Sequence, residues 1–311
     1  MTQPRMSVPG ATYLVTRTTV MSLFLLNPSP AVNNILEYCI AWAAQGRGIL
    51  LHAVSVESNH FHMVLTDTQG RLSDFMQELN RCAARCLIEH YRRRFPSRRL
   101  DAVWTSAQSF SATLLLNANA ILDELVYTYT NPVKDGLVRD YRDWPGFNTR
   151  PGHWREPERS VRRPDVYFKN TPEVLNYRLS APAQLDGPIE QVISTVELHI
   201  RQAQTQIAID LAAQRRSVLG AKAIRSVDPF ASPTTQRPVG DLNPQLAAGG
   251  DADALSNAKK ALKMFRLAYR AAWQCFKANA SAVFPGGTWL MRWRFGQLCE
   301  PLDASWCVVA T

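Results

Sequence analysis

Long apolar runs are missing from this sequence, and acidic side chains are fewer than basic ones. No stretch approaches the roughly 20 consecutive apolar residues that a membrane-spanning helix needs. The stretch MTQPRMSVPGATYLVTRTTV at the start lacks the apolar segment and small-residue cleavage site of a secretory signal. We therefore expect a cytoplasmic protein.

Closely spaced cysteine pairs are also missing. The cysteines are Cys39, Cys82, Cys86, Cys275, Cys299 and Cys307. None forms a CxxC pair, and the four-residue spacing of Cys82 and Cys86 places both on one side of a predicted helix. A zinc site would need further ligands that the sequence does not place, so we expect buried free thiols.

The composition indicates a globular protein with a basic surface. The chain has 311 residues, which is long enough for one large domain or two ordinary ones. Of these residues, 46% are apolar and 20% are charged, as in a globular protein. The net charge is +9. This excess favours a polyanionic partner such as nucleic acid, although many soluble proteins are basic without binding one.

The first half of the chain alternates strand and helix patterns. Strands are predicted over 11–19, 49–56 and 60–65. Helices are predicted over 31–45, after Gly70 and over 120–131. Ser73 is the predicted N-cap of the second helix, and Pro132 should stop or kink the third. This order predicts an α+β, ferredoxin-like antiparallel sheet with helices on one face. The other face would stay open, where nucleic acid could lie.

The second half is predicted to be mainly helical. We expect a catalytic domain over 1–150, a basic, proline-rich linker or arm over 151–188, and an accessory region over 189–311 that binds DNA or a partner. Helices are predicted over 189–218 and 257–279, with a loop between them. The closing stretch GGTWLMRWRFG alternates like a strand.

Two histidines share one face of a predicted strand. In SNHFHMVL, alternation places His60 and His62 on one face and Phe61, Met63 and Leu65 on the other. The two imidazoles could bind one divalent ion together. Taken alone the pattern is weak, because two histidines on an ordinary solvated sheet face give the same spacing.

A tyrosine and an asparagine share one face of a predicted helix. Tyr127 and Asn131 are four residues apart in DELVYTYTNPVKDGLV, whereas Tyr129 points toward the apolar side and is predicted to be a core residue. A tyrosine can attack a phosphodiester if a metal stabilises the developing negative charge. The alternative is a helix whose tyrosines only pack.

Together these stretches resemble the single-tyrosine HUH transposases, in particular the REP-associated tyrosine transposases. The resemblance rests on SNHFHMVLTD, LSDFMQELNRCAARCLIEHY, Trp104 and YTYTNPVKDGLVRDYRDWPGFNT, and covers residues 10–150. It implies a ferredoxin-like core that binds single-stranded DNA beside a hairpin. It also implies a Mg²⁺ or Mn²⁺ ion on His60 and His62, with Tyr127 as the nucleophile.

The same resemblance places Asn131 where the family has its third, polar metal ligand, although related enzymes have a glutamine there. One departure is visible, because the family usually has Met-Pro-Asn-His and this chain has Glu57-Ser58-Asn59-His60. Glu57 could reach the metal, or it could be a solvated carboxylate in the turn.

Basic residues indicate where DNA could bind. Arg81 and Arg85 lie opposite the apolar stripe of their helix, and a dense arginine tract follows. In the second half, cations and aromatic residues alternate in a way that suits phosphates and bases. The candidate DNA-binding residues are Arg17, Arg81, Arg85, Arg92, Arg93, Lys134, Lys263 and Arg266. A solvated helix face is the alternative.

The resemblance therefore implies a nucleoid-associated DNA nickase and strand transferase that works as a monomer or homodimer. A non-catalytic DNA- or RNA-binding protein on the same fold is the alternative. A replication initiator or relaxase agrees less well with this sequence, because those proteins usually carry helicase or other large domains that are absent here.

Overall fold

The structure is a computed structural model that describes residues 4–106, 109–234, 245–302 and 306. Cys307 and positions 235–244 of the predicted loop lie outside the described residues. Among the described helices, none is long and apolar enough to cross a membrane.

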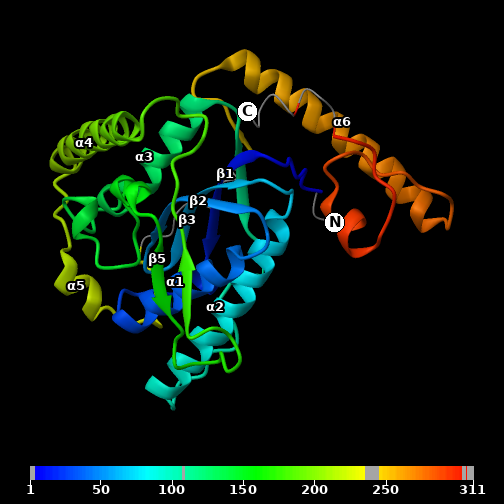
Figure 1. Cartoon of the computed structure of the whole chain (residues 1–311). Helices are drawn as coiled ribbons and strands as arrows, with labels where there is room; N and C mark the ends of the chain where they lie inside the picture. The colour runs from blue at the N-terminus through cyan, green and yellow to red at the C-terminus, as the bar shows by residue number, and fades with distance from the viewer. Residues whose placement is uncertain (1–3, 107–108, 235–244, 303–305, 307–311) are drawn as a thin grey trace.

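A mixed sheet forms the centre of the molecule (Figure 1). Its strands are β1 (Ala11–Thr18), β2 (Ile49–Val56), β3 (His60–Asp67), β4 (Ser111–Leu115) and β7 (Leu246–Ala247), in the order β2-β3-β1-β4-β7. The first four are antiparallel to their neighbours, and β7 runs parallel to β4. This confirms the predicted α+β class with its ferredoxin-like strand order. The sequence analysis had missed β4 and β7.

Helices cover both faces of the sheet. On one face, α1 (Pro30–Ala44) packs against α2 (Leu72–Arg94). Phe61 of β3 lies on this face, with its ring centroid 5.8 Å from that of Trp104, whose Nε1 donates to the Asn80 carbonyl of α2. On the other face, α3 (Ala118–Lys134) contacts β2, β3 and β4. The expectation of helices on one face only, with the other left open, was therefore wrong.

The N-terminus of α2 is capped from the preceding strand. Asp67, fully buried at the end of β3, accepts hydrogen bonds from the backbone N–H groups of Gln69, Arg71 and Leu72. A carboxylate in this position satisfies helix donors that have no partner within the helix. Ser73, the predicted N-cap, instead lies inside the first turn.

The ends of α1 and α3 also follow from local chemistry. Ser29 caps α1 by accepting from the Val32 N–H at 3.2 Å, with Pro30 as the first helical residue. The third helix continues to Lys134 and includes Pro132, so it does not stop there. Pro132 has no N–H to donate to the Thr128 carbonyl, so α3 lacks one hydrogen bond in its last turns.

Residues 151–188 contain more structure than a linker. Strands β5 (Arg159–Arg162) and β6 (Val174–Tyr177) form a two-stranded hairpin that contacts α1. Val161 and Leu175 of this hairpin are buried in the main core. The hydroxyl of Tyr38 on α1 donates to the Pro172 carbonyl at 2.6 Å. The segment therefore packs against α1 and contributes to the main core.

The C-terminal part is helical, as predicted. It contains α4 (Ile189–Ala213), α5 (Ala221–Ser226) and α6 (Ala252–Lys277). Figure 1 shows α4 beside α3, and α6 crossing the end of the molecule near the N-terminus. Ile193, Val196 and Ile200 of α4 belong to the main core. The stretch predicted as a strand forms a π-helical turn over Leu290–Arg294.

The described cysteines are free, as expected, but Cys275 is exposed and Cys299 is partly exposed, so the expectation of burial was wrong for these two. Cys39, Cys82 and Cys86 are buried among apolar residues between α1 and α2. Burial raises the pKa of the Cys39 and Cys82 thiols. They therefore act as small apolar side chains of the core.

A buried histidine links β2 to the rest of the core. His52 is fully buried, with Nδ1 2.7 Å from the Ser180 carbonyl and Nε2 2.8 Å from Thr66 Oγ1. Desolvation lowers its pKa to about 4 from its usual 6.5, although the Ser180 carbonyl opposes the shift. The folded protein therefore holds this imidazole neutral where the unfolded chain would protonate it.

We predict that His52 makes the protein less stable in mild acid. Between pH 6.5 and about 4 the unfolded chain binds a proton that the folded protein does not, so the free energy of unfolding falls as pH falls. This shift corresponds to about 3 kcal/mol over the window. Urea unfolding of His52→Gln at pH 7 and pH 4.5 should show a smaller loss than wild type. The control His199→Gln, at a half-exposed site on α4, should keep the wild-type loss.

Candidate active site

His60 and His62 lie together on the α3 face of the sheet. The register of β1 and β3 pairs Thr16 with His62 and Thr18 with His60. The two imidazole centroids are 4.8 Å apart, with their planes nearly perpendicular. Both residues are buried, with 6% and 4% of their surface exposed. The predicted sharing of one strand face is confirmed, and the face is covered rather than solvated.

Each imidazole is held by its Nδ1 atom. His60 Nδ1 is 2.8 Å from Asn59 Oδ1, and His62 Nδ1 is 2.9 Å from Thr16 Oγ1. An amide oxygen only accepts, so the proton of His60 is on Nδ1, and its Nε2 faces Asn131 as an acceptor. A neutral imidazole with an anchored Nδ1 is the form that binds metals.

The third helix brings Asn131 and Tyr127 to the same place. Asn131 is 1% exposed, and its Nδ2 lies 3.1 Å from His60 Nε2. The half-buried Tyr127 ring lies 5.1 Å from the His62 ring in an edge arrangement. Tyr129 is fully buried, and its hydroxyl donates to the His52 carbonyl at 3.3 Å. The prediction that Tyr129 is a core residue is confirmed, and Tyr127 lies beside His62.

Glu57 is part of this cluster. It is 2% exposed, its Oε1 accepts from Asn131 Nδ2 at 2.5 Å, and its Oε2 is 3.9 Å from His60 Nε2. The interpretation of Glu57 as a solvated turn carboxylate was wrong. The turn places it under α3 because the Glu57 N–H donates to the His60 carbonyl and closes the β2–β3 connection.

The donor set suits a divalent cation. Two imidazoles, a carboxylate and an amide are the ligand types that accept Mn²⁺ or Mg²⁺. Within the described part of the chain, no three His, Cys, Asp or Glu side chains form a metal-binding cluster by themselves. An ion at His60 and His62 would therefore need Asn131, water or substrate oxygens as well. The roles of these residues as ligands remain predictions.

The candidate DNA-binding residues do not converge on one surface. On α2, Arg81 pairs with Glu78, and both Arg92 and Arg93 pair with Glu89. Arg85 lies over the Tyr167 ring at 6.0 Å. Because α2 and the histidines lie on opposite faces of the sheet, these arginines are not at the histidine site.

The remaining four candidates occupy three places. Arg17 is 7% exposed on the α2 face and donates to the Thr105 carbonyl at 2.9 Å. Lys134 is at the site, with Nζ 5.0 Å from the centre of the Tyr127 ring. Lys263 and Arg266 line a separate groove beside α6.

Sequence reasoning missed the residues that orient the imidazoles. Thr16 stands on β1, far from His62 in sequence, and only the strand register brings them together. Asn59 was part of the histidine motif, but its hydrogen bond to His60 depends on the conformation of the turn. An alternating strand with a polar residue on the histidine face is the only signal that could have suggested Thr16.

Two solved structures are similar to this chain. One is a REP-associated tyrosine transposase bound to a REP hairpin, with 20% identity and a TM-score of 0.40, covering 58% of this chain and 99% of that one. The other is a "putative transposase" from Deinococcus radiodurans R1, with 21% identity and a TM-score of 0.26, covering 32% of this chain and 75% of that one. No family model and no curated protein matches the sequence.

We predict that Asn131 holds the buried cluster together. Asn131→Ala removes the amide that contacts both Glu57 and His60, in a site without solvent to replace it. Loss of a buried hydrogen-bond partner of a charged group costs about 1–3 kcal/mol. Urea unfolding in EDTA measures the loss. Asn119→Ala, an exposed position on the same helix, is the control and should change stability by less than about 0.5 kcal/mol. Equal effects of the two changes would contradict the prediction.

Proposed function

We propose that this protein is a metal-dependent tyrosine nuclease and strand transferase acting on single-stranded DNA with hairpins or repeats. The observation that supports this most is the convergence of His60, His62, Asn131 and Tyr127 in one site. These residues come from a strand and a helix that are far apart in sequence. A packing role alone would not require a buried carboxylate beside two buried imidazoles.

The ion would be held by His60 and His62, with the side chains of Asn131 and Glu57 next to them. A divalent cation bound there supplies positive charge where negative charge develops on the phosphate. The hydrogen bonds from Thr16 and Asn59 keep both imidazoles in fixed orientations, so the site is organised before substrate arrives.

Tyr127 is the nucleophile in this proposal. Its phenolic oxygen forms a bond to phosphorus while the bond to the leaving sugar oxygen breaks, and the phenol proton ends on that leaving hydroxyl. The product is a phosphotyrosine on one DNA end and a free hydroxyl on the other. Attack by a hydroxyl reverses the step and rejoins strands without ATP. Lys134, beside the Tyr127 ring, contributes a positive charge for the phosphate.

Covalent capture of DNA tests the nucleophile. We expect wild type with Mn²⁺ to form a protein–DNA adduct on labelled single-stranded hairpins from the repeats that flank the gene, as seen on a denaturing gel. A REP hairpin is bound in the similar REP-associated structure, so hairpins are the first substrates to try. Tyr127→Phe should bind the DNA and form no adduct.

Tyr129→Phe is the matched control for this experiment. It removes a hydroxyl from the same helix two residues away, where the tyrosine is buried. It should still form the adduct. A cut product that carries no protein, or an adduct that survives in Tyr127→Phe, would contradict the proposed mechanism.

The metal site has a test that does not depend on cleavage. In a Tyr127→Phe background, Glu57→Gln should weaken Mn²⁺ binding by about tenfold or more, because a charged oxygen beside the imidazoles is lost. Isothermal titration measures the affinity. Glu78→Gln, on the opposite face of the sheet, is the control and should leave Mn²⁺ binding unchanged. If Tyr127→Phe and the double variant Tyr127→Phe/Glu57→Gln bind Mn²⁺ with equal affinity, Glu57 does not take part in metal binding.

A DNA- or RNA-binding protein without catalysis is the second candidate. The groove beside α6, which collects cations away from the histidines, favours it. Tight binding of several flanking hairpins by wild type with Mn²⁺, without any adduct, would support this candidate over the nuclease.

A further inference from the structure

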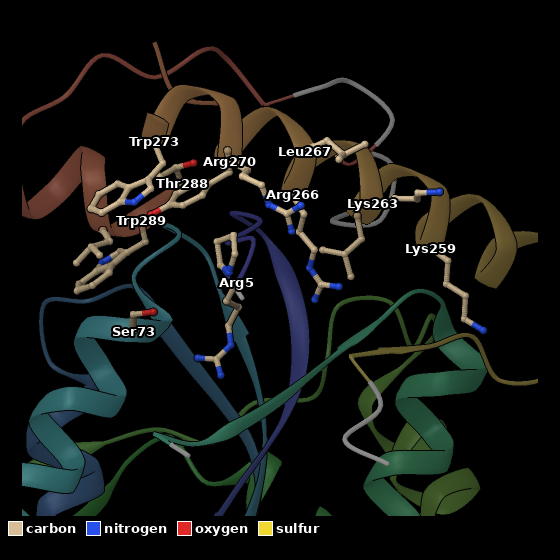
Figure 2. Close-up of a pocket in the computed structure, with 14 residues that line it drawn as sticks. Arg5, Ser73, Lys259, Lys263, Arg266, Leu267, Arg270, Trp273, Thr288 and Trp289 are labelled. Atoms are coloured by element: carbon tan, nitrogen blue, oxygen red, sulfur yellow. The ribbon is translucent and has the colours of Figure 1, made fainter. Parts of the chain in front are cut away.

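A groove lies between α6 and the end of the sheet (Figure 2). Its walls are α6 on one side, and the N-terminal segment, the start of α2 and residues 288–290 on the other. The cavity volume is about 800 Å³. This lies in the range of sites that bind small molecules or a few nucleotides.

The groove lies at the opposite end of the sheet from the histidines. Asp67 ends β3 and caps α2, and Ser73 in the first turn of that helix lines the groove. His60 is at the other end of β3, seven residues away, which is about 23 Å at roughly 3.3 Å per residue. The groove is therefore separate from the candidate active site.

Five cations line this groove. They are Arg5, Lys259, Lys263, Arg266 and Arg270. In the part of the chain that the structure describes, none of them has a carboxylate within ion-pair distance. On α2, by contrast, Arg81, Arg92 and Arg93 each lie within ion-pair distance of Glu78 or Glu89. A groove with five uncompensated positive charges attracts an anion.

Arg5 shows that the charge is partly desolvated. Its guanidinium lies over the Phe110 ring at 3.7 Å and donates to the Phe110 carbonyl at 2.7 Å. Burial lowers its pKa to about 10. A bound anion would replace part of the hydration that the Arg5 guanidinium has lost on burial.

The same walls carry aromatic rings and buried donors. Trp273, Trp289 and Tyr269 line the groove, as Figure 2 shows for the two tryptophans. Nε1 of both indoles and Oγ1 of Thr288, which is 4% exposed, have no hydrogen-bond partner among the described residues. An indole N–H only donates, so its missing partners are acceptors.

We propose that this groove binds a single-stranded nucleic acid segment. Phosphates would meet the lysines and arginines, and bases would stack on the tryptophans. A duplex keeps its bases stacked inside the helix, so they could not stack on the tryptophans. Phosphate pairing and stacking are common to DNA and RNA, so the chemistry admits either strand. The proposal does not depend on the Tyr127 reaction.

The test is a binding measurement on the full chain in EDTA, where metal-dependent cleavage is absent. Fluorescent dT12 and rU12 are titrated with protein, and anisotropy is recorded at several salt concentrations. Lys259→Ala/Lys263→Ala should weaken binding at least tenfold and reduce the salt slope by about 1.4, since each single-strand phosphate contributes about 0.7. The tighter of the two oligonucleotides assigns the groove to DNA or RNA.

The control pair is Lys260→Ala/Lys277→Ala, which removes the same charge from the same helix outside the groove. It should change affinity by less than twofold. Equal losses in the two double variants would overturn the proposal, because general charge would then explain binding.

A second pair of variants tests whether bases stack on a tryptophan of the groove. Trp289→Ala should weaken binding about tenfold, whereas Trp293→Ala, an exposed tryptophan outside the groove, should have little effect. Polyphosphate that binds as tightly as dT12, with no effect of Trp289→Ala, would show an anion site without base recognition and overturn the proposal. An adduct assay on the groove variants reports separately on Tyr127.

Discussion

The pairing of β3 with β1 is the constraint on which the candidate site depends. β3 lies inside the sheet, between β2 and β1, so its alternate residues face two different helical layers. Phe61, Met63 and Leu65 are fully or almost fully buried on one face, and His60 and His62 lie on the other. A shift of register by one residue would exchange the two sets. The apolar packing of one face therefore holds the imidazoles in place on the other.

Helix α3 covers the histidine face of the sheet and buries its polar side chains. An open sheet face would leave the histidines in water, where a metal must compete with solvent and the rings can turn. Under α3, the cluster of Glu57, Asn131 and His60 is shut away from solvent and joined by short hydrogen bonds. Buried polar networks are costly unless each group is satisfied. The hydrogen bonds from Thr16 and Asn59 lower that cost and fix the rings together.

Much of this arrangement could be predicted from the sequence, for identifiable reasons. Alternation in β3 and the four-residue spacing of Tyr127 and Asn131 are local properties of a strand and a helix. The side of the sheet on which α3 packs is not local, and neither is the burial of Glu57. Ser73 matched a capping pattern, but Asp67 had the better geometry from the strand before it. The stretch TWLMRWRF alternates like a strand, yet only Thr288 forms a β-bridge, with Met6, and Leu290–Arg294 form a π-helical turn.

The pairing of charged side chains is also a property that the sequence alone does not show. The sequence shows an excess of arginine and lysine, but it does not show which cations already have carboxylate partners. On α2, Arg81 pairs with Glu78, and Arg92 and Arg93 share Glu89 within about one helical turn. The five cations beside α6 have no carboxylate within ion-pair distance among the described residues. For a polyanion, the location of uncompensated charge matters more than the net charge. This places the more attractive surface at the end of the sheet away from the histidines. A strand held there could extend toward Tyr127 without competing for the candidate metal site.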